Sequence, residues 1–333
     1  MNKTLLTALL TALLTASTLV IPTVSSHAQN TGKPVLSFPV ISDIHIQAPQ
    51  PKSLQKFAAA LQDLHSASPA ADALIINGDL TDGEPADYQK LKETLQSNPH
   101  PPRVYYTIGN HEFFKAWHNK NRARSAATFP NGETERASIA RFLSLTGEKS
   151  VYHAKVIKGY TFVFLGSEQY RQSNPGNLED AYLSKKQLDW LEQTLVKASQ
   201  TGKPIFVFLH QPLPYTVSGT HTCCTNNRAV VQHEALKDIL NRFPEAILFT
   251  GHTHWELKLP QTFVQDNFTM VNTSSVAQPW TDNGQPGGGT PVKGEASEGL
   301  VVNVYTNKVE IKGRSFTKKQ WIPGAQFTVP ILQ

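Results

Sequence analysis

The chain has 333 residues, of which 39% are hydrophobic and 17% are charged. This balance predicts one large folded domain with a substantial core and excludes a chain that is disordered throughout. The formal net charge of +5 suits an anionic substrate, but the basic residues form no dense run, so we expect no stable binding to nucleic acid.

The N-terminal segment has the pattern of a secretory signal peptide. Lys3 precedes an uncharged, mostly apolar run over 4–24, and Ser26-His27-Ala28 has the form of a signal-peptidase site. We predict that residues 1–28 are removed by cleavage after Ala28, which leaves a secreted or periplasmic protein without a membrane contact. An uncleaved anchor is the alternative, since the run approaches the roughly 18 residues that span a bilayer. The threonine content and the cleavage site disfavour that alternative.

The first half of the mature chain is predicted to alternate strands and helices. Strand-type runs cover 35–41, 73–76 and 104–108, and helical spacing predicts helices from Ser53, as N-cap, and over 86–96. Right-handed crossovers make these three strands parallel, so the residues that follow them meet at one edge of the sheet. Those residues are Asp43, His45, Asp79 and Asn110.

Residues 112–150 differ from the rest of the chain in composition, since they are rich in aromatic and cationic side chains. A helix is predicted over 136–145. Two interpretations are open: a flap whose cations meet substrate phosphate, or a solvated surface excursion that has no part in the chemistry. His118 in this segment and His221 in a later loop are weaker candidates for substrate contact. The cations concerned are Lys115, Lys120, Arg122, Arg124, Arg136 and Arg141.

The second half continues the alternation. Ser184 and Gln187 form a capping box at the start of one helix. Strand-type runs end at His210 and at the turn that contains His252 and His254. The predicted elements are a hairpin over 151–165, a helix over 184–199, a strand over 205–209, a helix over 230–242, strands over 246–250 and 268–272, and a hairpin over 300–312.

Domain boundaries follow from these elements. We place one domain over 33–315, with a Gly/Pro-rich loop over 279–298, and a C-terminal tail over 316–333. The two cysteines, Cys223 and Cys224, are neighbours and therefore close no loop. They are either free thiols or a vicinal disulfide, and an exported protein is compatible with the second state.

The residues that follow the strands carry donors suited to divalent metals. Imidazole and carboxylate ligands suit Mn, Fe or Zn, and no thiolate occurs at any of these strand ends. The donors are Asp43, His45, Asp79, Asn110, His210, His252 and His254. This set is too large for one tetrahedral ion but suits two ions that share a carboxylate. Asp79 is the expected bridge, with one oxygen for each ion.

These residues also carry a family resemblance. Asp43-Ile-His45, Gly78-Asp79-Leu-Thr-Asp82, Gly109-Asn110-His111-Glu112, His210 and Gly251-His252-Thr-His254 occur in this order. Together they resemble the full motif set of the calcineurin-like metallophosphoesterases, over about 43–254.

The resemblance implies a fold and an assignment of ligands. The fold is α/β, with two mixed β-sheets packed face to face and helices on the outer faces, a four-layer sandwich. Asp43, His45, Asp79 and His254 would hold one metal, and Asp79, Asn110, His210 and His252 the other. Asp82 would orient a ligand rather than bind metal. A purple acid phosphatase has tyrosine at this position, so that subfamily is disfavoured.

The expected function is that of a secreted, dinuclear metal-dependent phosphoesterase. A metal-bridging hydroxide would attack phosphorus in a small phosphate ester. His111, next to the ligand Asn110, would protonate the leaving oxygen or stabilise the developing charge. Gly-Asn-His-Glu and the stretch from His210 resemble bacterial cyclic-nucleotide-type diesterases, so phosphodiesters rank ahead of monoesters. The alternatives are a phosphomonoesterase on the same site and a non-catalytic ligand-binding protein that keeps the fold.

Overall fold

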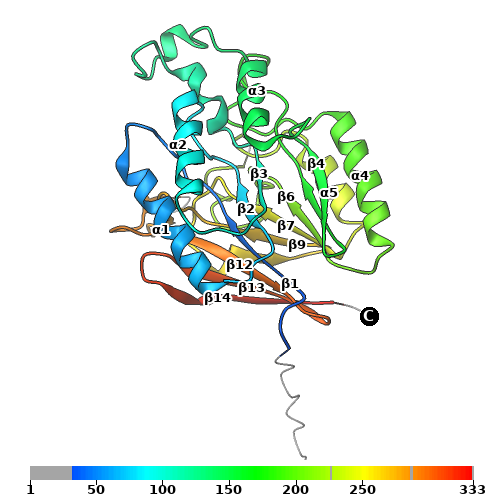
Figure 1. Cartoon of the computed structure of the whole chain (residues 1–333). Helices are drawn as coiled ribbons and strands as arrows, with labels where there is room; N and C mark the ends of the chain where they lie inside the picture. The colour runs from blue at the N-terminus through cyan, green and yellow to red at the C-terminus, as the bar shows by residue number, and fades with distance from the viewer. Residues whose placement is uncertain (1–31, 226, 286–287, 332–333) are drawn as a thin grey trace, which may run out of the picture. The chain divides into compact units, whose positions relative to one another are not determined.

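The computed structural model describes residues 32–225, 227–285 and 288–331. The predicted signal peptide, residues 1–28, lies outside the described residues. Within them, no helix combines the length and apolarity needed to cross a membrane. Two six-stranded sheets and the helices that cover them form the framework of the described chain (Figure 1).

The first sheet has the strand order β14-β13-β12-β1-β2-β3. Its parallel half pairs β1 with β2 and β2 with β3, as the predicted crossovers require. The other half is antiparallel and comes from the C-terminal part of the chain. The strands are β1 (Leu36–Ile41), β2 (Leu74–Asn77), β3 (Val104–Thr107), β12 (Glu298–Val304), β13 (Lys308–Ser315) and β14 (Gln320–Pro330).

The second sheet has the strand order β4-β5-β6-β7-β9-β8. The run from β5 to β9 is parallel, while β4 and β8 pair antiparallel at the two edges. Both sheets are thus mixed, as expected. The strands are β4 (His153–Ile157), β5 (Tyr160–Phe164), β6 (Ile205–Phe208), β7 (Ala246–Thr250), β8 (Phe263–Gln265) and β9 (Thr269–Asn272).

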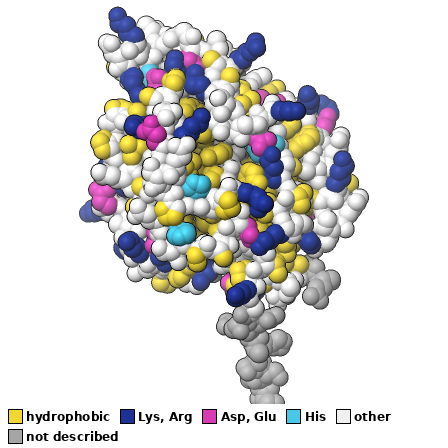
Figure 2. Space-filling view, in the orientation of Figure 1, with side chains coloured by type: hydrophobic (Ala, Val, Ile, Leu, Met, Phe, Trp, Pro, Cys, Tyr) yellow, Lys and Arg dark blue, Asp and Glu magenta, His cyan; other side chains and the backbone are white. Residues whose placement is uncertain are grey.

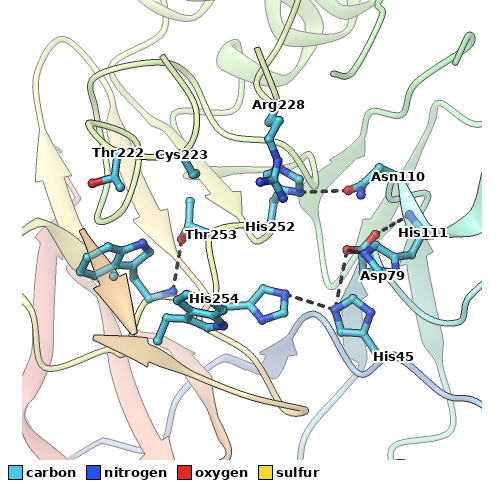
Figure 3. A pocket seen from close by; sticks show the side chains of 13 residues that line it. His45, Asp79, Asn110, His111, Thr222, Cys223, Arg228, His252, Thr253 and His254 are labelled. Atoms are coloured by element: carbon cyan, nitrogen blue, oxygen red, sulfur yellow. Dashed lines mark hydrogen bonds and ion pairs between the residues drawn. The ribbon is translucent and has the colours of Figure 1, made fainter. Parts of the chain in front are cut away.

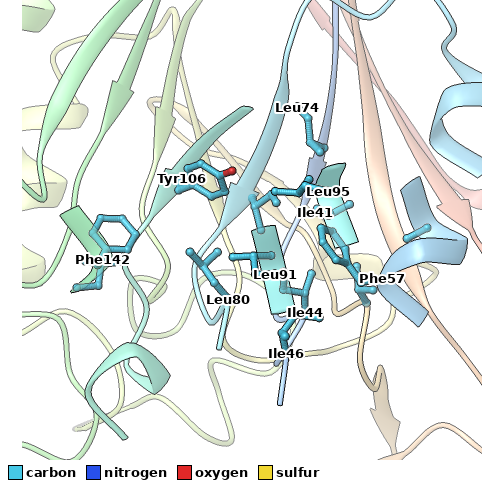
Figure 4. Close-up of a cluster of buried hydrophobic side chains, with 14 of the residues drawn as sticks. Ile41, Ile44, Ile46, Phe57, Leu74, Leu80, Leu91, Leu95, Tyr106 and Phe142 are labelled. Atoms are coloured by element: carbon cyan, nitrogen blue, oxygen red, sulfur yellow. The ribbon is translucent and has the colours of Figure 1, made fainter. Parts of the chain in front are cut away.

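Three hydrophobic clusters hold four layers together. The central cluster lies between the sheets, where Phe38 of β1 contacts Phe206 of β6 with ring centroids 4.9 Å apart. An outer cluster joins the first sheet to α1 and α2 (Figure 4). A third joins the second sheet to α4 and α5. Since the inner strands are covered on both faces, their sequences are continuous apolar runs. The helices are α1 (Pro51–Ala67), α2 (Pro85–Gln96), α3 (Glu135–Thr146), α4 (Lys185–Ser199) and α5 (His233–Leu240).

Some predicted boundaries need correction. Helix α1 begins at Pro51, two residues before the predicted N-cap Ser53. Proline suits the first helical position because it has no N–H that would need an acceptor there. Ser53 Oγ instead accepts a hydrogen bond from Gln47 N–H. The expected tail over 316–333 contains β14, which pairs with β13 as an edge strand. Pro323 and Gly324 interrupt its alternation and hid the strand, although an edge strand tolerates proline. The Gly/Pro-rich loop contains a short ribbon, β10 (Trp280–Asp282) with β11 (Gly289–Pro291).

Candidate metal centre

The seven predicted donor residues lie together at the carboxyl ends of strands from both sheets. The loops after β1, β2 and β3 bring Asp43, His45, Asp79 and Asn110, and the loops after β6 and β7 bring His210, His252 and His254. Two close groups of potential metal-binding side chains form among them, and Asp79 belongs to both. Figure 3 shows His45, Asp79, His252 and His254 around the same cavity.

The first group consists of Asp43, His45, Asp79 and His254, with donor atoms all within 4.8 Å of one another. His254 Nε2 lies 2.9 Å from Asp43 Oδ1 and 3.1 Å from His45 Nε2. His45 Nε2 lies 3.8 Å from Asp79 Oδ2. Four donors therefore point at one small volume, as the ligands of one ion do.

The second group consists of Asp79, His210 and His252, with Asn110 beside it. His210 Nε2 lies 3.1 Å from Asp79 Oδ2, and His252 Nδ1 lies 2.9 Å from Asn110 Oδ1. The other Asp79 oxygen, Oδ1, accepts a hydrogen bond of 2.9 Å from His111 N–H. Asp79 Oδ2 is therefore the oxygen that faces both groups, whereas the sequence interpretation assigned one oxygen to each ion.

The hydrogen bonds around these side chains fit a metal site. His210 Nδ1 and His254 Nδ1 lie 2.8 and 3.0 Å from the backbone carbonyls of Asn77 and Gln278, so each ring can keep the proton on Nδ1 and a lone pair on Nε2. Among the described residues, four buried site atoms have no hydrogen-bond partner: Asp43 Oδ1, Asn110 Nδ2, His210 Nε2 and His252 Nε2. Buried polar atoms are normally paired. A divalent cation in each group would satisfy the carboxylate oxygen and the two imidazole nitrogens among them, so these residues suit divalent metal ions as the cofactor.

The backbone is forced into unusual conformations to aim these donors. Asp43, His45, Asp79, His252 and His254 all have positive φ, between 45° and 68°. Each such non-glycine residue costs about 1 kcal/mol or more, and such strain concentrates at functional sites. Glycine keeps the approach open beside them, because a Cβ at position 78 would lie 2.4 Å from the His210 ring and one at 109 would lie 2.2 Å from Asp79 Oδ1.

The electrostatics favour bound positive charge. Burial opposes ionisation of Asp43, yet His254 and His210 lower the pKa of its carboxyl to about 2. Burial and nearby His111 lower the pKa of His45 to about 4. Burial opposes protonation of His210, yet Asp79 and Asp43 raise its pKa to about 10. Bound metal would therefore displace a proton from this histidine.

His111 lies beside the donors but contacts a different partner. Its Nδ1 lies 2.8 Å from Asp82 Oδ1, while its Nε2 faces Asp79 Oδ2 at 3.8 Å. Burial opposes protonation, but Asp79 and Asp82 raise the pKa of His111 to about 9. His111 Nε2 is therefore placed to donate a proton into the cavity.

Glu112 is a buried residue whose role the sequence analysis did not assign. Its carboxylate accepts hydrogen bonds from the backbone N–H groups of Leu80, Thr81 and Gly109, at 2.8–3.0 Å. It therefore ties the loop that carries Asp79 to the loop that carries Asn110. The Gly-Asn-His-Glu motif was the one sequence signal that could have singled out Glu112. The motif does not show which backbone N–H groups its carboxylate binds.

Five of the donors line a cavity of about 400 Å³: His45, Asp79, Asn110, His252 and His254. Loops and the β10–β11 ribbon form its other walls. In residues 32–225, 227–285 and 288–331, Arg228 is the one Lys or Arg that lines it, and Arg228 Nε lies 2.9 Å from Glu179 Oε2. Cys223, joined to Cys224 by a disulfide, also lines this cavity. No local pattern in the sequence marked Arg228. On the face drawn in Figure 2, Lys and Arg are spread out rather than gathered in one patch.

The cations of the 112–150 excursion do not line the cavity. Lys115 Nζ lies 2.9 Å from Glu133, Arg141 pairs with the same carboxylate, and Arg122 lies 2.9 Å from buried Asp87. The flap interpretation is therefore corrected for these residues, because internal carboxylates already neutralise them. His118 pairs with Glu84, and His221 packs against Tyr215; neither lines the cavity.

Fold and site together define a class. A four-layer α/β/β/α sandwich with paired carboxylate and imidazole donors at its strand ends is the arrangement of a metal-dependent phosphoric ester hydrolase. The chain belongs to the calcineurin-like phosphoesterase family, whose sequence profile matches residues 36–256. The family resemblance, the predicted fold class and the predicted hydrolase activity are thereby confirmed.

Relatives of known activity are distant. A 3′,5′-cyclic-nucleotide phosphodiesterase from Nostoc sp. is 24% identical over 231 residues, which cover 67% of this chain and 73% of that protein. A manganese-dependent ADP-ribose/CDP-alcohol diphosphatase from Mus musculus is 22% identical and covers 87% of this chain and 94% of that protein.

Solved structures share the fold. A dimetal phosphatase from Danio rerio superposes with a TM-score of 0.61 at 14% identity and covers 90% of this chain and all of that one. A purple acid phosphatase from yellow lupin has a TM-score of 0.56 at 13% identity and covers 90% of this chain and 54% of that one. At this identity the likeness concerns the fold alone, so the argument from Asp82 against that subfamily stays a prediction.

Proposed function

We propose that this protein is a secreted, dinuclear metal phosphoesterase that hydrolyses small phosphate esters, with phosphodiesters ahead of monoesters. The observation that carries the proposal is the position of Asp79 Oδ2, which faces both groups of donors at once. One group would hold an ion through Asp43, His45 and His254, and the other through Asn110, His210 and His252. The relatives that act on cyclic nucleotides and on diphosphates support this choice of substrate class.

The bound ions supply Lewis acidity and lower the pKa of coordinated water. The side chains of the protein position the ester and donate a proton to the leaving group. His111, held by Asp82 at 2.8 Å, directs Nε2 toward the cavity and can protonate the departing oxygen. Arg228 lies on the wall beside His252 and can contact a phosphoryl oxygen or a second anionic group of the substrate (Figure 3).

The charge balance of the cavity favours diesters. A monoester carries up to two negative charges near neutral pH, whereas a diester carries one. Among the described residues, Arg228 is the one Lys or Arg in the cavity lining, and Glu179 already offsets part of its charge. A monoesterase would benefit from a second cation in the lining. The phosphomonoesterase alternative therefore ranks second.

A non-catalytic ligand-binding protein remains the rival from another class. It would require neither intact metal ligands nor a proton donor. Here the seven donors converge and His111 keeps its partner Asp82. This completeness supports catalysis over ligand binding alone.

Secretion is part of the proposal. It is supported by the signal-peptide pattern over 1–28 and by the disulfide between Cys223 and Cys224, since disulfides persist in oxidising compartments. Expression of the full chain in an exporting host, followed by N-terminal sequencing, should give a mature protein that starts at Gln29. A cytosolic, uncleaved product would contradict this part.

One experiment tests the enzymatic core. Metal-free protein is loaded with Mn, Fe or Zn, its metal content is measured by mass spectrometry, and each form is assayed with 4-nitrophenyl phosphate, bis(4-nitrophenyl) phosphate and cyclic nucleotides. We expect two ions per chain and faster hydrolysis of a diester than of the monoester. Stoichiometric metal without turnover of any ester would favour the ligand-binding alternative, and one ion per chain would refute the dinuclear site.

A further inference from the structure

The cavity has two chemically different ends. One end consists of the metal-binding carboxylates and imidazoles. The other is lined by Trp255, Trp280 and Gly289, with the uncharged Thr222 and Cys223 nearby. Figure 3 shows Thr222 and Cys223 on the side away from Asp79 and His111. A phosphate group needs only the first end, so the second is available to the organic part of an ester.

The two tryptophans are positioned by the metal centre itself. Trp255 directly follows the donor His254, and the segments of Trp255 and Trp280 pair as a parallel bridge. Trp280 N–H donates to the carbonyl of His254 at 2.8 Å, and Ala277 N–H, three residues before Trp280, donates to the carbonyl of Asp43 at 3.0 Å. The aromatic wall is therefore held at a set position relative to the donors.

Glycine 289 keeps the wall open. A Cβ at this position would lie 3.0 Å from Trp255 Cζ2 and 3.5 Å from Trp280 Cε3, so a larger side chain would occupy the space against both indoles. Trp255 is 8% exposed, while Trp280 is half-buried on the β10–β11 ribbon. A cavity of about 400 Å³ also has room for far more than a phosphate group.

We propose that Trp255 and Trp280 form a specificity subsite that stacks a planar aromatic ring in the ester group of the substrate, as in a nucleotide-type phosphate ester. This inference rests on the proposed function, since it places the phosphate at the metal end. Indole faces stack on any base, and such stacking makes a large contribution to nucleotide affinity. The wall therefore selects for the ring and tolerates different bases.

The test uses two ligands that differ only in the base, adenosine 5′-monophosphate and ribose 5-phosphate. Their competitive inhibition constants are measured on the metal-loaded protein from initial rates with methyl 4-nitrophenyl phosphate. In the wild type we expect the adenosine ligand to bind at least about tenfold tighter. Trp280→Leu should weaken its binding about tenfold and change that of ribose 5-phosphate less than twofold.

Two further variants keep the result interpretable. Trp321→Leu removes a half-buried tryptophan on β14, outside the cavity lining, and should change neither constant. Trp280→Phe keeps an aromatic face and should retain more affinity for the adenosine ligand than Trp280→Leu. Thermal melting shows whether each variant folds. If Trp280→Leu does not fold, Trp280→Phe alone is compared with the wild type.

Three outcomes are decisive against the proposal. Equal wild-type affinity for both ligands would overturn the aromatic subsite while leaving the proposed function intact, because the reporter ester is still hydrolysed. An equal loss for both ligands in Trp280→Leu would show damage to the metal end instead of lost stacking. Absence of hydrolysis of every ester in the panel would refute the proposed function and this inference together.

Discussion

Two charged regions of the molecule invite comparison: the strand-end loops that hold the donors, and the excursion over 112–150. Both carry many ionisable side chains, and both were candidates for contact with a phosphate ester. In the first, Asp43 Oδ1 and His210 Nε2 are buried without a hydrogen-bond partner among the described residues. In the second, cations such as Arg122 already face buried carboxylates. The metal site is thus marked by unpaired metal-ligating atoms that converge on one small volume, rather than by the number of charges.

The largest effect is expected at the residue that the two donor groups share. Asp79→Asn removes the charge that faces both, so metal content and turnover should fall together, turnover by at least about 100-fold. Metal analysis and a diesterase assay measure the two effects. Asp189→Asn, which alters an exposed carboxylate paired with Lys185 on α4, is the matched control. Full metal occupancy in Asp79→Asn would show that the bridge is elsewhere.

The next largest effect is expected at His111. His111→Ala should retain both metals and lose about 10²–10⁴-fold in turnover, because proton donation to the leaving oxygen is lost. The loss should be smaller for an ester with nitrophenolate as leaving group, which departs without a proton. If turnover of esters with poor leaving groups stays at the wild-type level, His111 is not the proton donor.

An intermediate effect is expected on the cavity wall. Arg228→Gln should raise KM for a diester about three- to tenfold and change kcat little, since a partly exposed cation adds ground-state attraction. Arg242→Gln is the matched control, because Arg242 also pairs with a glutamate but lies outside the cavity lining. The same KM for wild type and Arg228→Gln would remove Arg228 from the substrate site.

The smallest effect on turnover is expected in the excursion. Arg122→Gln should change kcat/KM less than twofold, yet lower the free energy of unfolding by about 1–3 kcal/mol, because Asp87 would stay buried without its cation. Denaturant unfolding and the diesterase assay separate these quantities. A tenfold loss of turnover with full metal content would restore the flap interpretation and remove the contrast between the regions.

Some errors in the sequence interpretation have a common cause. Ser184 caps α4 as predicted, with Oγ accepting from Gln187 N–H, but the Gln187 side chain contacts Gly166 and Glu168 instead of returning to Ser184. Strand β14 and the β10–β11 ribbon were missed because their pairing partners, not their own periodicity, make them strands. In each case a contact from a distant segment outweighed a local pattern.

The sequence by itself determined which segments become the inner strands, because strands buried on both faces need continuous apolar runs, and it determined the donors that follow those runs. Only the tertiary structure decided that Asp79 faces both donor groups through one oxygen, that Arg228 reaches the cavity while the cations of 112–150 do not, and that Trp255 and Trp280 meet beside His254. The physical reason is the separation along the chain of the residues that determine each feature. Strand formation and turns follow from neighbours in the chain, whereas the distance between side chains on different sheets depends on how those sheets pack.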